Sequence, residues 1–116
     1  MRYILKTLIL LYATVGFSQN ELILDSLYEQ LEILKEDTSR VEILNELAFQ
    51  FRRTDPAKAK SYADEAKLIS ERINFKRGTA TAFLRLGLIA KTEGNLVLAE
   101  EFYLKSLTIR KELNDK

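Results

Sequence analysis

The sequence predicts an all-α protein, an α-solenoid in which antiparallel pairs of helices stack on one another. Apolar residues recur at steps of three and four along most of the chain, which is helical spacing. Residues that break helices are few, with one proline and four glycines among 116 residues. A helix–turn–helix segment also recurs after about 40 residues. Repetition at such a period is typical of a solenoid rather than of a closed bundle.

Composition limits the chain to one domain and excludes several kinds of chemistry. The formal net charge is +1, from 18 basic and 17 acidic residues, so no basic surplus favours nucleic-acid binding. The absence of cysteine and histidine removes thiol nucleophiles, serine–histidine triads and the usual zinc sites. The adjacent carboxylates of Glu100 and Glu101 diverge on a helix, whereas acid–base catalysis needs converging groups. We therefore expect no enzyme activity, no cofactor and no metal.

Residues 1–18 have the composition of a secretory signal peptide. Arg2 and Lys6 form a basic start, residues 7–15 are almost wholly apolar, and Gly16-Phe17-Ser18 places small residues before Gln19. This order of basic, apolar and small residues predicts cleavage before Gln19 and export to the periplasm or cell exterior. The apolar run is shorter than the roughly 20 residues of a membrane span. The alternative is a buried first helix.

The first two helices after this segment are predicted from their apolar stripes. A leading helix is expected over residues 21–35, followed by an interruption at residues 36–39. Ser39 and Glu42 have the spacing of a capping box, so the next helix should start there and run to about Arg53. The leading stripe consists of Leu24, Leu27, Leu31 and Leu34, flanked by Ile23 and Tyr28, and the second of Val41, Leu44, Leu47, Ala48 and Phe51.

Three more helices are predicted after residue 54. Asp55 and Pro56 are a natural N-cap and first helical residue, and a break with Gly78 as terminator is expected at residues 74–78. A helix over residues 79–92, a turn capped by Asn95 and a helix over residues 96–113 should follow. The three stripes are Ala59, Tyr62, Ala63, Ala66, Ile69 and Ile73; Phe83, Leu86, Gly87 and Ala90; and Ala99, Phe102, Tyr103, Ser106 and Leu107.

Small residues on the last two stripes predict a close contact between their helices. Gly87 lies within a helix, where glycine costs about 1 kcal/mol relative to alanine and usually has a packing reason. We expect Gly87 to pack against Ala99, with Tyr103 filling the space one turn further on. Gly87→Leu should separate the helices, whereas Gly87→Ala should cost little or even stabilise them.

The two halves of the chain match, and the repeated unit resembles the tetratricopeptide repeat (TPR). Leu47-Ala48 corresponds to Leu86-Gly87, and Ala59 corresponds to Ala99. The resemblance implies a leading helix of a degenerate repeat at residues 19–37, one repeat at 38–77 and another at 78–116. The order of segments looks like that of the exported TPR region of bacterial sensor kinases and regulators. The expected packing residues are Leu47, Ala48, Ala59, Ala66, Leu86, Gly87, Ala99, Tyr103 and Ser106.

In TPR proteins the first helix of each unit lines a concave groove, so the resemblance also implies a set of partner-binding residues. Phe49 and Leu88 would be the apolar anchors of this groove, within a basic rim. The alternative is that both contact a neighbouring helix and that the groove is merely solvated. The basic pairs Arg52-Arg53 and Lys76-Arg77 are expected to complement helix C-termini. The groove set is Asn45, Phe49, Arg52, Arg53, Thr81, Arg85, Leu88 and Lys91.

The sequence thus favours a non-catalytic protein–protein interaction module that binds a peptide or partner protein in the groove of a TPR solenoid. An alternative is the sensory N-terminal region of a longer membrane-bound signalling protein, a histidine kinase or transcriptional regulator. A third is a self-associating structural protein. The last helix should also expose an apolar patch that further repeats or a second copy would cover, formed by Phe102, Leu104, Ile109 and Leu113.

Overall fold

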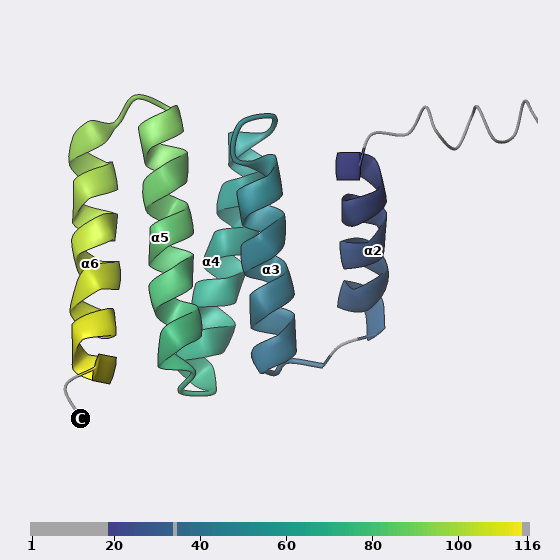
Figure 1. Cartoon of the computed structure of the whole chain (residues 1–116), viewed down its shortest axis with the longest axis horizontal. Coiled ribbons are helices and arrows are strands. Elements are labelled where there is room, and N and C mark those ends of the chain that lie inside the picture. Colours follow the sequence, from purple (N-terminus) through teal and green to yellow (C-terminus); the bar gives the residue numbers. More distant parts are fainter. Residues whose placement is uncertain (1–18, 34, 115–116) are drawn as a thin grey trace, which may run out of the picture.

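The computed structural model describes residues 19–33 and 35–114 (Figure 1). The predicted signal peptide with its cleavage motif, and Leu34 of the leading stripe, lie outside the described residues. The all-α prediction is confirmed for the described part, and none of its helices is long and apolar enough to cross a membrane. The helices are α2 (Gln19–Ile33), α3 (Thr38–Phe51), α4 (Pro56–Arg72), α5 (Lys76–Thr92) and α6 (Leu96–Asn114).

The helices lie side by side, and each packs on the next one along the chain. Contacts join α2 to α3, α3 to α4, α4 to α5 and α5 to α6, and α3 also touches α5 directly. Figure 1 shows α4 behind α3 and α5, so that these two helices share the opposite face of the layer. The backbone of α2 lies against that of α3, and Tyr28 of α2 also interacts with Lys58 and Tyr62 of α4.

Side-chain caps fix the starts of three helices. The capping box predicted at Ser39 is wrong, because Asp37 is the N-cap of α3 and accepts a hydrogen bond from the Arg40 amide at 3.1 Å. The predicted cap at Asp55 is confirmed, and its carboxylate accepts from the Lys58 amide. Asn95 caps α6 in the same way, as predicted.

The turn between α4 and α5 differs from the prediction. Gly78 does not terminate a helix, because α5 already begins at Lys76 and Gly78 is buried in its first turn. The chain reverses instead at Asn74, whose φ of 58° lies in the left-handed region that asparagine tolerates. The repeat boundary expected between residues 77 and 78 therefore falls inside α5. The other bounds differ by a few residues, since α2 covers 19–33 and α3 ends at Phe51.

The core consists of two clusters between neighbouring helices. Alanines on α4 allow α3 and α5 to pack closely against it. Larger, partly buried apolar side chains pack around each cluster. Of the stripe residues, Ile73 is 36% exposed and Leu107 is 47% exposed, so both were wrongly placed in the core. The first cluster contains Val41, Leu44, Ala66, Ile69 and Ala82, and the second contains Ala48, Ala59, Ala63, Leu86 and Ile89.

Gly87 of α5 faces Tyr103 and Ala99 of α6, and alanine does not fit there freely. A Cβ at Gly87 would lie 2.5 Å from Cε1 and 2.6 Å from Cδ1 of Tyr103, and 3.3 Å from the Ala99 carbonyl oxygen. The Tyr103 ring occupies the space of the added methyl group, so Gly87→Ala requires this ring or the helices to move. Ser106 is buried and donates a hydrogen bond to the Ala80 carbonyl at 2.7 Å.

Of the four apolar side chains predicted to be exposed on α6, Leu104 is exposed and the other three are not. Phe102 packs on the second core cluster and stacks on Phe83, with 6.2 Å between the ring centroids. Ile109 and Leu113 are half-buried. The large apolar side chains of α6 that are exposed are Leu96, Val97, Leu104 and Leu107.

Candidate functional site: the face shared by α3 and α5

The candidate site is the face where α3 and α5 meet. Arg85 of α5 donates a hydrogen bond from Nε to the backbone carbonyl of Asn45 on α3, with 3.1 Å between the two atoms. The two residues are 40 positions apart, which is the period of the sequence repeat. Equivalent helices of the two predicted units are therefore joined by a hydrogen bond between two residues of the predicted groove set.

Phe49 lies beneath two guanidinium groups on this face. The Arg52 guanidinium carbon is 3.7 Å from the Phe49 ring centroid, and that of Arg85 is 4.6 Å from it. Burial lowers the pKa of the Arg85 guanidinium, and the nearby cations Arg52 and Arg110 lower it further, against the opposing effect of Glu46. Arg85 is thus a partly buried cation among other cations, held over an aromatic ring.

A hollow of about 250 Å³ opens beside Arg85, and we call it the arginine pocket. Of the predicted groove set, Asn45, Thr81 and Arg85 line it. The remaining lining residues were missed by sequence reasoning, because they come from the N-cap and first turn of α5, from α6 and from the exposed side of α3. The pocket is lined by Glu42, Asn45, Phe75, Arg77, Gly78, Thr81, Arg85 and Arg110.

Asn45 is a buried polar residue whose side-chain amide has a hydrogen bond at Nδ2 but none at Oδ1. Its side chain is 3% exposed, and Nδ2 donates a hydrogen bond to the Gly78 carbonyl at 3.2 Å. Its Oδ1 is buried and has no hydrogen-bond partner in the structure. An unpaired buried acceptor costs about 1–3 kcal/mol. Such a group in a native fold calls for a physical explanation, for which a bound donor is one candidate.

The start of α5 is held against α3 by close packing. A Cβ at Gly78 would lie 2.7 Å from Cγ1 of Val41 and 2.6 Å from Cδ2 of Phe75, so only glycine fits without movement. This approach places the Gly78 carbonyl within reach of the Asn45 amide. Thr81, one turn further along α5, donates a hydrogen bond to the Arg77 carbonyl and accepts one from Arg110 at 3.4 Å.

The other predicted groove residues are not gathered into the arginine pocket. Leu88 is half-buried, and Arg53 and Lys91 are exposed. Arg52 donates a hydrogen bond to the Phe49 carbonyl at 2.7 Å, so it does complement the C-terminus of α3 as expected.

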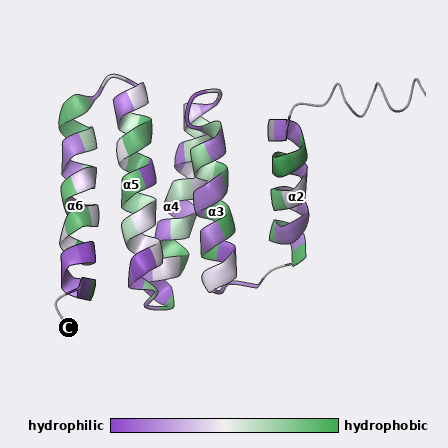
Figure 2. Cartoon of the chain, viewed as in Figure 1, coloured by the Kyte–Doolittle hydropathy of each residue, from purple (hydrophilic) through white to green (hydrophobic). Residues whose placement is uncertain are grey.

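The basic pair Lys76-Arg77 does not have the predicted role. Both residues belong to the first turn of α5, so they lie at the N-terminus of a helix rather than at a C-terminus. The helix dipole disfavours cations there. Figure 2 shows this hydrophilic start of α5 beside the hydrophilic end of α6.

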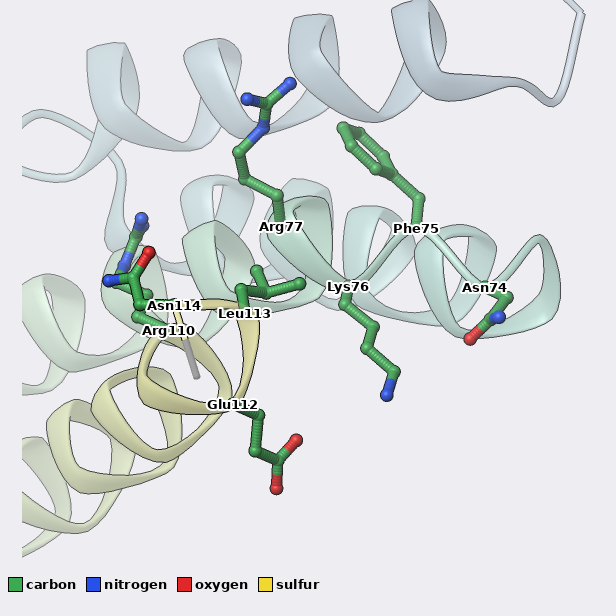
Figure 3. A pocket seen from close by; sticks show the side chains of 8 residues that line it. All are labelled: Asn74, Phe75, Lys76, Arg77, Arg110, Glu112, Leu113 and Asn114. Atoms are coloured by element: carbon green, nitrogen blue, oxygen red, sulfur yellow. The ribbon is translucent and has the colours of Figure 1, made fainter. Parts of the chain in front are cut away.

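A second hollow, of about 720 Å³, adjoins the arginine pocket and shares Phe75, Arg77 and Arg110 with it. Figure 3 shows Phe75 and Arg77 pointing to one side of the start of α5, and Lys76 and Glu112 pointing to the other. This hollow borders the last described residues of α6, whereas the arginine pocket lies on the face shared by α3 and α5.

In the described part of the chain, no three carboxylates lie close enough together to form a metal site. A comparison with protein-family models, curated proteins and solved structures found no match to the chain.

Proposed function

We propose that the chain is a non-catalytic interaction module of the TPR type, which binds an extended peptide or a segment of a partner protein on the face shared by α3 and α5. In this proposal α3 and α5 are the first helices of two successive solenoid units, and α4 and α6 are the second helices. The same face would serve a free-standing exported module or the sensory region of a longer signalling protein.

The hydrogen bond between Arg85 and Asn45 is the observation that carries this proposal. It joins the two helices that would be equivalent in successive units. Arg85 also lies over the Phe49 ring, beside Arg52, and lines a hollow with Thr81. The surface combines an aromatic ring, cations and polar groups. Peptide-binding grooves use apolar pockets for anchoring and a few polar groups for orientation.

Panning short random peptides against the purified chain tests the proposal. The affinities of the selected peptides would then be measured by fluorescence anisotropy for the parent and for Phe49→Ser. We expect at least a tenfold loss for this variant, because about 1.4 kcal/mol of lost contact corresponds to a factor of ten. Thermal melting of the variant shows whether it stays folded.

The matched control is Leu68→Ser, which removes a 58% exposed apolar side chain from α4. Since α4 lies behind α3 and α5, its affinity for the same peptides should equal that of the parent. Selected peptides that bind both variants as tightly as the parent would contradict the proposed face.

A further inference from the structure

One side of α6 carries a row of exposed residues at alternating steps of three and four. They are Val97, Glu100, Leu104, Leu107 and Lys111, and we call them the α6 seam. The three apolar side chains are 72%, 54% and 47% exposed, in chain order. Steps of three and four keep all five residues on one side of a helix. The alternation is the heptad spacing through which two helices pair as a coiled coil.

The α6 seam is distinct from the sides of α6 that pack within the chain. The buried residues of α6 are Ala99 and Ser106, and the Ser106 hydroxyl donates a hydrogen bond to α5. Phe102 and Ile109 lie on another flank, where they line hollows together with residues of α4. Among the described helices, the backbone of α6 lies against that of α5 only, and Figure 1 shows α6 at the end of the row. The α6 seam is therefore open to a second molecule.

The two charged residues of the α6 seam flank its leucines and cannot reach each other. Glu100 and Lys111 are eleven residues apart, which is about 16 Å along a helix. Within residues 19–33 and 35–114, neither of them forms an ion pair. Covering a charge without pairing it is costly. A molecule that covers the α6 seam must therefore supply a cation near Glu100 and an anion near Lys111.

A second copy of α6 that runs antiparallel supplies both charges. In one register, Leu104 of the first copy faces Leu107 of the second. Glu100 lies four residues before Leu104, and Lys111 lies four residues after Leu107, so in antiparallel helices Glu100 then faces Lys111. A two-fold axis repeats the contact, which places the leucines of both copies between two ion pairs. A parallel copy would instead bring Glu100 against Glu100 and Lys111 against Lys111.

We propose that α6 is a homodimer interface, in which the α6 seams of two copies pack antiparallel in this register. The charge pattern of the seam complements itself, and this favours a second copy over a further solenoid unit as the occupant. The interface is a different surface from the proposed peptide-binding face, so the inference does not depend on peptide binding.

Sedimentation equilibrium of the whole chain tests the inference. Because the interface is short, chain concentrations from about 10 µM to about 1 mM are covered, in about 0.1 M salt to limit screening. The parent should show an equilibrium between monomer and dimer. Glu100→Lys and Lys111→Glu should each weaken dimerisation at least about tenfold, because two attractive pairs become two repulsive ones.

The matched control is Glu112→Lys, which makes the same charge change elsewhere on α6. Glu112 is exposed and lines a hollow with residues of α4, away from the α6 seam. Its replacement should alter the dissociation constant less than about twofold, as surface charges usually do.

Combining the two charge reversals fixes the direction of pairing. The double variant with Glu100→Lys and Lys111→Glu restores both ion pairs in an antiparallel dimer, so its dissociation constant should return to within about threefold of the parent value. In a parallel dimer the same variant would remain repulsive. An equimolar mixture of the two single variants should form a heterodimer, which also shows that both variants are folded.

Three results would overturn the inference. A parent chain that stays monomeric at about 1 mM would assign the α6 seam to another occupant, such as a further repeat. Single variants that dimerise as tightly as the parent would place the interface elsewhere. A double variant as weak as the single variants would exclude the antiparallel register.

Discussion

Gly87 offers the sharpest test of the packing between α5 and α6. Replacing it by alanine has two opposite effects. Helix propensity favours alanine by about 1 kcal/mol. The added Cβ, however, would lie 2.5 Å from Cε1 and 2.6 Å from Cδ1 of Tyr103, which is too close for an ordinary contact. The half-buried Tyr103 ring must turn away or the helices must separate.

The balance of these two effects gives the expected magnitude. Overpacking of a well-packed contact costs about 1–3 kcal/mol, so subtracting about 1 kcal/mol of propensity leaves Gly87→Ala about 1 kcal/mol less stable than the parent. In a domain of this size that corresponds to a fall in Tm of about 4–8 °C. Gly87→Leu adds a larger side chain at the same point, with the Ala99 carbonyl oxygen 3.3 Å from the Cβ position, and should lie at the upper end of the range.

A double-mutant cycle with Tyr103→Ala isolates the contact. Without the Tyr103 ring, Gly87→Ala should become stabilising by about 1 kcal/mol, because helix propensity alone remains. The free energy of unfolding of all four proteins is measured by urea denaturation followed by circular dichroism. If Gly87→Ala stabilises the chain equally with and without the Tyr103 ring, the coupling is zero and the steric reasoning is refuted.

Four further predictions concern other parts of the chain. Gly94→Ala should lower the free energy of unfolding by about 1 kcal/mol, because φ at this residue is +83°, a backbone conformation that alanine disfavours. A steric clash is not the reason, since no atom lies within 4 Å of the added Cβ. An unchanged melting curve would contradict this prediction. Combining Leu104→Glu with Leu107→Lys should abolish concentration-dependent sedimentation without lowering Tm, since both side chains are exposed; a strictly monomeric parent would disprove association through α6. Burial, and then the neighbouring Tyr28 and Glu65, raise the pKa of Tyr62 from 10.0 to about 12. The folded state therefore keeps a proton that the unfolded state loses, so the free energy of unfolding should fall between pH 10 and pH 12. Tyr62→Phe should remove this fall in urea titrations at alkaline pH. An intact mass of protein secreted by a bacterial host should show Gln19 as the first residue, and a product that keeps residues 1–18 would argue against a signal peptide.

Helix existence was predictable here because local signals are strong. Asp55 followed by Pro56 marks a helix start in sequence as clearly as in the structure, and Asn95 does the same for α6. The start of α5 carries no such signal. Phe75 is not a capping residue type, and Gly78 was taken for a terminator although its role is close packing against Val41. Helix starts that depend on tertiary packing cannot be read from local sequence.

The candidate site was predictable only where it follows the repeat. Asn45 and Arg85 occupy equivalent helices, so the period alone brings them to one face. Arg110 comes from a different helix and Arg77 from the misplaced helix start, and no spacing in the sequence relates them to Asn45. Their meeting in one pocket depends on how the start of α5 and the end of α6 pack together in the folded chain. Nor does the sequence indicate that Oδ1 of Asn45 lacks a partner.

The attachment of α2 has a consequence for how the protein opens. The backbone of α2 lies against α3 alone among the described helices, and its contacts with α4 are made by side chains such as Tyr28, whereas α4 is held from both sides by α3 and α5. Its burial is also thin, since Leu27 is buried but Leu22, Ile23 and Ile33 are exposed. Elements with few buried contacts open as separate cooperative units, well below the free energy of global unfolding. Amide hydrogens of α2 should therefore exchange with solvent as a group, ahead of those of α4 and α5, and each such opening would uncover the part of the first core cluster on which Leu31 packs.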